Sequence, residues 1–133
     1  MLRAAIALDP ESVETLNDLA IALRRKGQPA EALALYRQAL ASNPEFAEAH
    51  FNLAGTLADA GDIASALEHY RAAVRLRPEN AYYRSVLGIE LARQNDLAGA
   101  LEQFEEAVRL EPAEPTYRKN LERARGLAAN AQR

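Results

Sequence analysis

The sequence contains no cysteine and no tryptophan, and only two of its 133 residues are histidine. Without cysteine, disulfides and thiolate metal sites are excluded, and the redox compartment is left open. Aromatic residues make up only 6% of the chain, although 49% of it is hydrophobic. This composition is typical of an alanine-rich helical stack rather than of a globular core built on large side chains.

An excess of basic charge and a long apolar run are also missing. The chain carries 16 basic and 19 acidic residues, a net charge of −3, so no basic surplus favours nucleic acid or an anionic membrane. No apolar run approaches the ~20 residues that a membrane span needs. We therefore predict a cytoplasmic protein with no nucleic-acid partner and no membrane insertion.

The sequence offers little that points to catalysis. His50 and His69 have no carboxylate or second histidine at ligand spacing, and we interpret both as structural or solvated residues that need not meet. The six glycines are scattered and form no phosphate-binding loop. We predict that the chain is not an enzyme and binds no metal and no cofactor.

What the sequence does contain is a repeat of 34 residues. Four prolines, two series of alanines and one aromatic series keep this step: Pro10, Pro44, Pro78 and Pro112; Ala32, Ala66 and Ala100; Ala39, Ala73 and Ala107; Tyr36, Tyr70 and Phe104. A fixed period in this range indicates an architecture of stacked repeats.

Each period is predicted to be a pair of helices. In the first, Leu16, Leu19 and Leu23 recur at three- and four-residue steps, which is one face of a helix. A residue suited to the left-handed conformation follows each first helix: Gly27, Gly61 and Asn95. Asp62 and Asp96 then serve as N-caps, and Pro29 replaces the cap by occupying a first helical turn. The second helices are expected at Ala30–Ser42, Ala64–Arg77 and Ala98–Leu110, and a last helix at Thr116–Ala129.

These residues resemble the tetratricopeptide repeat family. The first full repeat carries Leu16, Leu19, Ala20, Leu23, Ala32, Tyr36, Ala39 and Pro44 at the family's characteristic positions. The resemblance implies an all-α fold, a right-handed α-solenoid of stacked helix–turn–helix units. It divides a single domain, 1–133, into a half-repeat (1–12), repeats 13–46, 47–80 and 81–114, and a capping helix (115–133). The family usually has Trp or Tyr at position 4, where this chain has Leu16, His50 and Arg84, so we expect a loosely packed or half-exposed slot there.

The two ends of the predicted stack differ. At the C-terminal end Glu122 and Arg125 give the last helix a polar outer face, as the terminal helix of a solenoid requires. At the N-terminal end the half-repeat leaves an apolar edge at Leu2, Ile6 and Leu8. We therefore expect this segment either to fray or to pair with the same edge of a second chain, forming a homodimer.

The resemblance also implies a concave groove, lined by the first helix of each repeat, that takes a protein or peptide ligand. The candidate residues are Asn17, Ile21, Phe51, Asn52, Gly55, Tyr82, Ser85, Val86, Ile89, Lys119, Asn120 and Arg123. Four of them, Phe51, Tyr82, Val86 and Ile89, are large apolar side chains on a face that needs no core, and such patches mark binding sites. Because Gly55 has no side chain, we expect a hollow beside Phe51.

Two known ligand-binding patterns of the family can be compared with these positions. The carboxylate clamp of chaperone-binding members is not matched, since only Asn52 fits it. The asparagine ladder of the O-linked N-acetylglucosamine transferases is half present, with Asp18, Asn52, Val86 and Asn120 in its slot. We predict a scaffold for protein–protein interaction. The alternatives are a regulatory or targeting fragment of a larger enzyme or assembly factor whose catalytic part is absent, or a self-associating scaffold.

Overall fold

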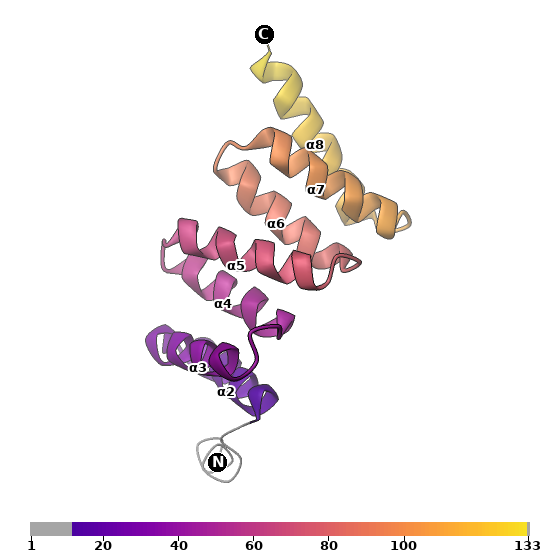
Figure 1. Cartoon of the computed structure of the whole chain (residues 1–133). Helices are drawn as coiled ribbons and strands as arrows, with labels where there is room; N and C mark the ends of the chain where they lie inside the picture. The colour runs from indigo at the N-terminus through magenta and orange to yellow at the C-terminus, as the bar shows by residue number, and fades with distance from the viewer. Residues whose placement is uncertain (1–11, 133) are drawn as a thin grey trace. The chain divides into compact units, whose positions relative to one another are not determined.

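The computed structural model describes residues 12–132, and its helices run in chain order from indigo to yellow in Figure 1. The helices are α2 (Val13–Arg25), α3 (Pro29–Ser42), α4 (Ala47–Asp59), α5 (Ile63–Leu76), α6 (Ala81–Arg93), α7 (Leu97–Leu110) and α8 (Pro115–Ala131). No strand occurs within residues 12–132. The predicted all-α class and the paired helices are confirmed, with boundaries within one or two residues. The predicted half-repeat and its apolar edge at Leu2, Ile6 and Leu8 lie outside the described residues.

The turns between paired helices follow the predicted chemistry. Gly27, Gly61 and Asn95 have φ angles of 79°, 89° and 64°, so all three occupy the left-handed region. Asp62 Oδ1 accepts a hydrogen bond from Ser65 N at 3.3 Å, and Asp96 Oδ1 accepts one from Gly99 N at 2.9 Å. These bonds satisfy backbone donors that the first turn of a helix leaves without a partner.

Contacts divide the described chain into two compact units, with the boundary between Leu76 and Arg77. In the first unit α2 pairs with α3 and α4 pairs with α5, and α4 also packs against α3. One core cluster joins Leu16, Ala39 and Ala49 from three successive helices. Leu16 is 0% exposed, so the prediction of a loose slot was wrong for this residue. A leucine fills the slot because Val13, Leu35 and Phe46 pack around the same cluster.

The second unit contains α6, α7 and α8, and α8 packs against both of the other helices. Its core cluster joins Ala81, Ala107 and Tyr117. A methyl group added at Gly88 would lie 2.5 Å from Cε1 of Phe104, so α6 and the Phe104 ring approach closely only because this residue is glycine. Glu122 and Arg125 are exposed on α8, and Arg125 NH2 lies 3.7 Å from Oε2 of Glu105 on α7. The single-domain organisation of 1–133 and the repeat boundaries within it stay predictions.

Candidate binding groove

The structure places the twelve predicted groove residues in three different environments. Tyr82, Ile89, Lys119 and Arg123 are exposed, and Ile21, Phe51, Asn52, Gly55, Val86 and Asn120 are half-buried. Asn17 and Ser85, however, are only 1% and 3% exposed. The prediction that these two side chains line an open groove was therefore wrong.

The buried pair has a structural role that the sequence pattern did not reveal. Asn52 Nδ2 donates a hydrogen bond to Asn17 Oδ1 at 3.1 Å, and Asn120 Nδ2 donates one to Ser85 Oγ at 3.1 Å. Each bond joins consecutive first helices across 35 residues of sequence. A buried polar side chain needs such a partner. The two asparagines of the half-present ladder thus hold one helix to the next within each unit.

A pocket in the second unit lies between α6, α7 and α8, and we call it the apolar pocket. Its volume is about 320 Å³, and its lining residues are Ile89, Ala92, Arg93, Phe104, Asn120, Arg123, Ala124 and Leu127. Ile89 and Leu127 are 37% and 49% exposed, which makes them two of the three large hydrophobic side chains exposed among the described residues; the third is Tyr82, at 57%. An apolar floor with exposed aliphatic walls suits an apolar ligand group.

Charged groups surround the apolar pocket. Arg93 and Arg123 line it and are both exposed. Arg93 NH1 lies 3.6 Å from Oε1 of Glu90, whose carboxylate is buried one turn earlier on α6. The positive charge of Arg93 is therefore partly balanced within the helix, whereas no ion pair within residues 12–132 involves Arg123.

A second pocket, which we call the arginine pocket, lies in the first unit between α2, α3 and α4. Its volume is about 390 Å³, and its lining residues are Ile21, Arg24, Arg25, Tyr36 and Asn52. Each of these five has an equivalent 68 residues later that lines the apolar pocket: Ile89, Ala92, Arg93, Phe104 and Asn120. The two pockets thus share five positions of the repeat, and at two of them Arg24 and Tyr36 stand in place of alanine and phenylalanine. The apolar pocket is also lined by Arg123, Ala124 and Leu127, where the first unit has Gly55, Thr56 and Asp59.

The expected hollow beside Phe51 is occupied. The guanidinium of Arg24 extends over Gly55, with NH1 3.1 Å from the point where a Cβ would be. It then donates a hydrogen bond to Asp59 Oδ2 at 2.6 Å. Phe51 is half-buried, and its ring meets the ring of Tyr70 edge-on, with centroids 5.5 Å apart. Gly55 therefore makes room for an arginine of the preceding helix pair rather than for an open cavity.

The two histidines also depart from expectation, because they contact each other. His50 Nδ1 lies 3.0 Å from His69 Nδ1, and the rings stack with centroids 5.2 Å apart. His50 Nε2 lies 2.8 Å from the carbonyl oxygen of Pro44, to which it donates. This contact is not visible in the sequence pattern, because the two residues are 19 apart and on different helices.

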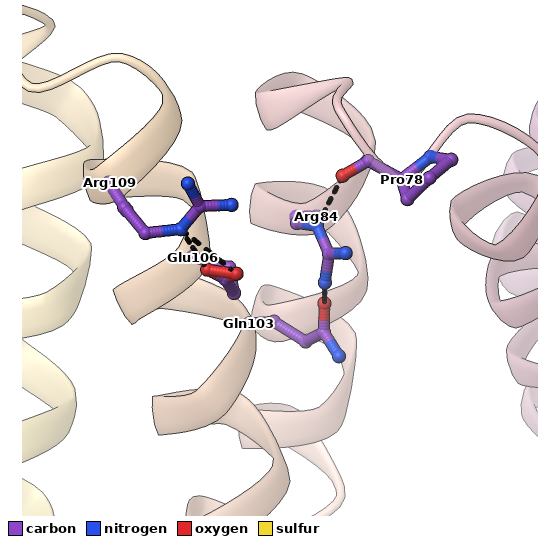
Figure 2. A network of polar contacts seen from close by, with 5 residues as sticks. All are labelled: Pro78, Arg84, Gln103, Glu106 and Arg109. Carbon is purple, nitrogen blue, oxygen red and sulfur yellow. Dashed lines mark hydrogen bonds and ion pairs between the residues drawn. The ribbon is translucent and has the colours of Figure 1, made fainter.

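The equivalent residues of the next repeat form the same connection without histidine. As Figure 2 shows, Arg84 Nε donates to the carbonyl oxygen of Pro78 at 2.7 Å, and Arg84 NH1 donates to Gln103 Oε1 at 3.1 Å. The same figure shows Arg109 and Glu106 paired on α7. His50 and Arg84 are half-buried, as predicted for position 4. Their role is polar, since each ties a first helix to the preceding proline turn and to the second helix.

Four sites have shifted pKa values with clear causes, and at one of them burial raises the pKa of Tyr117. Burial, together with the nearby His50, lowers the pKa of His69. The hydrogen bond from Arg109 lowers the pKa of the Glu106 carboxyl. Burial raises the pKa of the Tyr36 hydroxyl, against the opposing influences of the Arg24 charge and the Thr56 hydroxyl. None of these groups belongs to a cluster of three or more metal-ligating side chains among residues 12–132.

Sequence reasoning missed several lining residues. Leu127 holds the same repeat position as Arg25 and Arg93, so the 34-residue register could have found it. Tyr36 and Phe104, which the sequence pattern places only in the repeating aromatic series, each line a pocket as well. Among the described residues no helix combines the length and the apolar character that crossing a bilayer requires.

Comparisons with known proteins agree with this arrangement of paired helices. Solved structures with the same fold include a crystal structure of MamA (TM-score 0.86, 20% identity, 96% of this chain and 75% of that one). They also include a MamA RS-1 ArsTM double mutant (0.81, 24%, 92% and 69%). A third is the first TPR of Spaghetti (RPAP3) bound to the HSP90 peptide SRMEEVD (0.82, 20%, 91% and 96%). No curated protein matches the sequence.

The repeat itself is recognised in the sequence. The family model described as tetratricopeptide repeat matches residues 1–36, 17–81 and 56–115 in overlapping segments. These segments cover most of the chain, and the solved structures show the same helical repeat fold. The chain belongs to the tetratricopeptide repeat family.

Proposed function

We propose that this chain is a scaffold that binds a peptide segment of a partner protein along the first helices of its repeats. The observation that carries the proposal is the apolar pocket, where Ile89 and Leu127 expose aliphatic surface around a floor formed by Phe104. Covering such surface with an apolar ligand group stabilises a complex by about 25 cal/mol for each Å² removed from water. Exposed apolar patches of this kind favour an interaction role.

The comparisons support a peptide as the ligand class. The first TPR of Spaghetti (RPAP3), which has the same fold over 91% of this chain, is bound to the HSP90 peptide SRMEEVD. At 20% identity that likeness concerns the fold, and the residues that contact a ligand are specific to each chain. We therefore infer the ligand class from it and take the site from the pocket.

Selection of a random peptide library on the purified protein, followed by calorimetry, tests the proposal. We expect selected peptides with an apolar residue at a fixed position. Ile89→Ala and Leu127→Ala should each weaken them about tenfold, since losing an apolar anchor costs about 1–3 kcal/mol. Glu102→Ala, on an exposed part of α7 away from the pocket, is the matched control. If the wild type and the three variants bind the selected peptides with equal affinity, the apolar pocket is not the binding site.

The groove of the first unit is tested separately. We propose that Phe51 and Asn52 contribute to ligand binding together with Tyr82 and Ile89. Phe51→Ala should lower the affinity for a confirmed partner, and Asn52→Ala should lower both affinity and stability because it removes the bond to Asn17. Unchanged affinity in both variants would exclude this part of the groove.

Self-association is a second proposal, based on the sequence of the N-terminal segment. We infer that the apolar residues Leu2, Ile6 and Leu8 pair two chains at high concentration. Sedimentation equilibrium over a wide concentration range should detect a dimer. The variant Ile6→Asp should remain monomeric; a wild-type protein that stays monomeric throughout would refute the pairing.

The alternative role, as a regulatory or targeting part of a larger enzyme, leads to the same expectation for the chain in isolation. We propose that it has no hydrolase or transferase turnover of its own, takes up no stoichiometric metal and works without a cofactor. Elemental analysis that found close to one metal ion per chain would contradict this.

A further inference from the structure

We propose that the arginine pocket binds the carboxylate of an aspartate or glutamate side chain in a peptide partner. The inference deepens the proposed function and rests on it, because it names the chemistry of one part of the ligand. The residues that carry it are Arg24, Arg25 and Tyr36, with Ile21 as an apolar wall.

The first argument is the comparison of two pockets built at the same repeat positions. Where the apolar pocket has Ala92 and Phe104, the arginine pocket has Arg24 and Tyr36. These two replacements place a guanidinium and a hydroxyl at shared positions, whereas the other three shared positions hold the same residue types, isoleucine, arginine and asparagine. The second arginine of the apolar pocket, Arg123, lies at a different repeat position, where the first unit has Gly55. Both groups donate hydrogen bonds, so they favour a ligand group that accepts them. Because the guanidinium is positively charged, the favoured acceptor is an anion.

The second argument is the state of the Tyr36 hydroxyl. Tyr36 is fully buried, and its hydroxyl has no hydrogen-bond partner among the described residues. The neighbouring Thr56 hydroxyl, which acts on the pKa of Tyr36, donates to the carbonyl oxygen of Asn52 at 3.0 Å and does not meet hydrogen-bond geometry with the Tyr36 hydroxyl. A buried hydroxyl without a partner costs free energy, and packing does not require it, since Phe104 fills the equivalent place. A ligand oxygen that reaches the pocket floor would supply the missing partner.

The third argument is that the arginines are available to a ligand. Arg24 is held by Asp59, an exposed carboxylate, through one 2.6 Å bond, so its remaining donors are free to bind elsewhere. Arg25 is exposed and forms no ion pair within residues 12–132. The Tyr36 oxygen is covered in the free chain, so we infer that Arg24 moves when the ligand enters. Asp59 then acts as a competitor that holds the site closed.

A side-chain carboxylate fits these residues better than a phosphate of nucleic acid. A planar carboxylate pairs with an arginine fork, and its methylene stem can lie against Ile21. The chain as a whole carries a net charge of −3, which opposes binding to a polyanion. The arginines and Tyr36 are also outside the carboxylate-clamp slots, of which this chain matches only Asn52.

Titration of the full chain with two blocked tripeptides, acetyl-Ala-Glu-Ala-amide and acetyl-Ala-Gln-Ala-amide, tests the proposal by NMR. The glutamate peptide should shift the Nε–H signals of Arg24 and Arg25, and it should bind about tenfold more tightly than its neutral isostere, as a charge-assisted bond predicts. Equal binding of the two peptides would overturn the proposal.

Variants with matched controls separate the site from general electrostatics. Arg25→Gln should weaken the glutamate peptide about tenfold, whereas Arg71→Gln, on an exposed part of α5, should not. Tyr36→Phe should weaken binding while the melting temperature stays equal or rises, because an unpaired buried hydroxyl is removed. Asp59→Asn should strengthen binding more than the equal charge change Glu68→Gln. A lower melting temperature in Tyr36→Phe, or equal changes in affinity for the glutamate peptide in Asp59→Asn and Glu68→Gln, would overturn the mechanism.

Two further comparisons distinguish a failure of this inference from a failure of the proposed function. If inorganic phosphate or a single-stranded oligonucleotide shifts the same arginine signals as strongly as the glutamate peptide, the site is a general anion site and the inference is wrong. If selected peptides depend on Ile89 and Leu127 but not on Arg25, only this inference fails. If the glutamate peptide binds at Arg25 while no peptide depends on Ile89, the inference stands and the proposed function loses its main site.

Discussion

At the residue scale, position 4 of the repeat shows how one structural role can be filled by different chemistry. His50 and Arg84 both bind the carbonyl oxygen of the proline that ends the preceding repeat. Each also reaches the second helix of its own pair, through His69 or Gln103. Arginine donates at any physiological pH, whereas two neutral imidazoles must share roles, one ring nitrogen donating and the other accepting. The histidine version alone is therefore sensitive to pH.

This difference predicts a pH dependence of stability. Burial and the nearby His50 lower the pKa of His69, with a further lowering from Arg37 on α3 and a partial opposing effect of Glu68. Since the unfolded chain binds the proton more readily, stability is full above the unfolded pKa of about 6.5 and falls as the pH drops below it, until the folded pKa is passed. Urea midpoints between about pH 5 and pH 8 measure this.

The next repeat suggests the control variant for the pH experiment. His69→Gln introduces the residue found at Gln103 and should flatten the pH dependence in this range, because Gln does not titrate. A variant whose urea midpoint falls with pH as steeply as that of the wild type would show that other groups are responsible.

Two glycines on helices predict opposite effects of the same substitution. Gly126→Ala on α8 should stabilise the protein by about 1 kcal/mol, because a Cβ there would meet no atom within 4 Å and alanine favours the helix. Gly88→Ala should destabilise it by about 1–3 kcal/mol, since the new methyl group would press on the buried Phe104 ring. Thermal melts of both variants check the signs. A stabilising Gly88→Ala would mean that Phe104 shifts freely.

At the element scale, the second helices differ in how they begin. Asp62 and Asp96 accept hydrogen bonds in the first turns of α5 and α7, but Gln28, at the equivalent position before α3, makes no such bond. Pro29 compensates in part, because it removes one backbone donor and presets the helical φ angle. The three turns thus share one backbone path with unequal capping.

An aspartate cap before α3, like those before α5 and α7, should stabilise this helix. Gln28→Asp should raise the free energy of unfolding by about 1 kcal/mol, since an aspartate N-cap is worth about 0.5–2 kcal/mol. Asp96→Ala should lower it by a similar amount, and by more than Asp62→Ala, because the Asp96 bond is shorter (2.9 Å against 3.3 Å). Chemical denaturation measures all three. A Gln28→Asp variant no more stable than wild type would show that Pro29 leaves no donor for the cap.

At the scale of the whole molecule, stability comes from many small contacts. The buried core consists largely of alanine and leucine, with one aromatic residue of each second helix inserted between them: Tyr36, Tyr70 and Phe104. Helices approach closely where these alanines lie, so enlarging one such as Ala66 should cost about 1–3 kcal/mol. Tyr70→Ala should cost about 3–5 kcal/mol, because it empties a large buried volume.

The fold itself predicts a simple spectroscopic result. Far-UV circular dichroism of the whole chain should show a mainly helical protein, because the described residues are organised as helices joined by short turns. An appreciable contribution from β-structure would contradict the fold.

The sequence by itself determined the repeat and everything that depends on local chemistry. The 34-residue period places prolines after helices, and the positive-φ residues Gly27, Gly61 and Asn95 and the caps Asp62 and Asp96 were all predicted from residue type. These features depend on backbone conformation within a few residues, and the resemblance to the family then supplied the fold and the approximate position of the groove.

Only the tertiary structure decided what each groove residue does. Side chains 35 residues apart meet across adjacent helices, so whether Asn17 is exposed or buried depends on where the Asn52 amide lies. A long arginine can cross from one helix to the next, as Arg24 does over Gly55 to Asp59, and repeat position alone does not reveal where it ends. The contact between His50 and His69 was missed for the same reason, since packing between helices, rather than spacing within one, brings the two rings together.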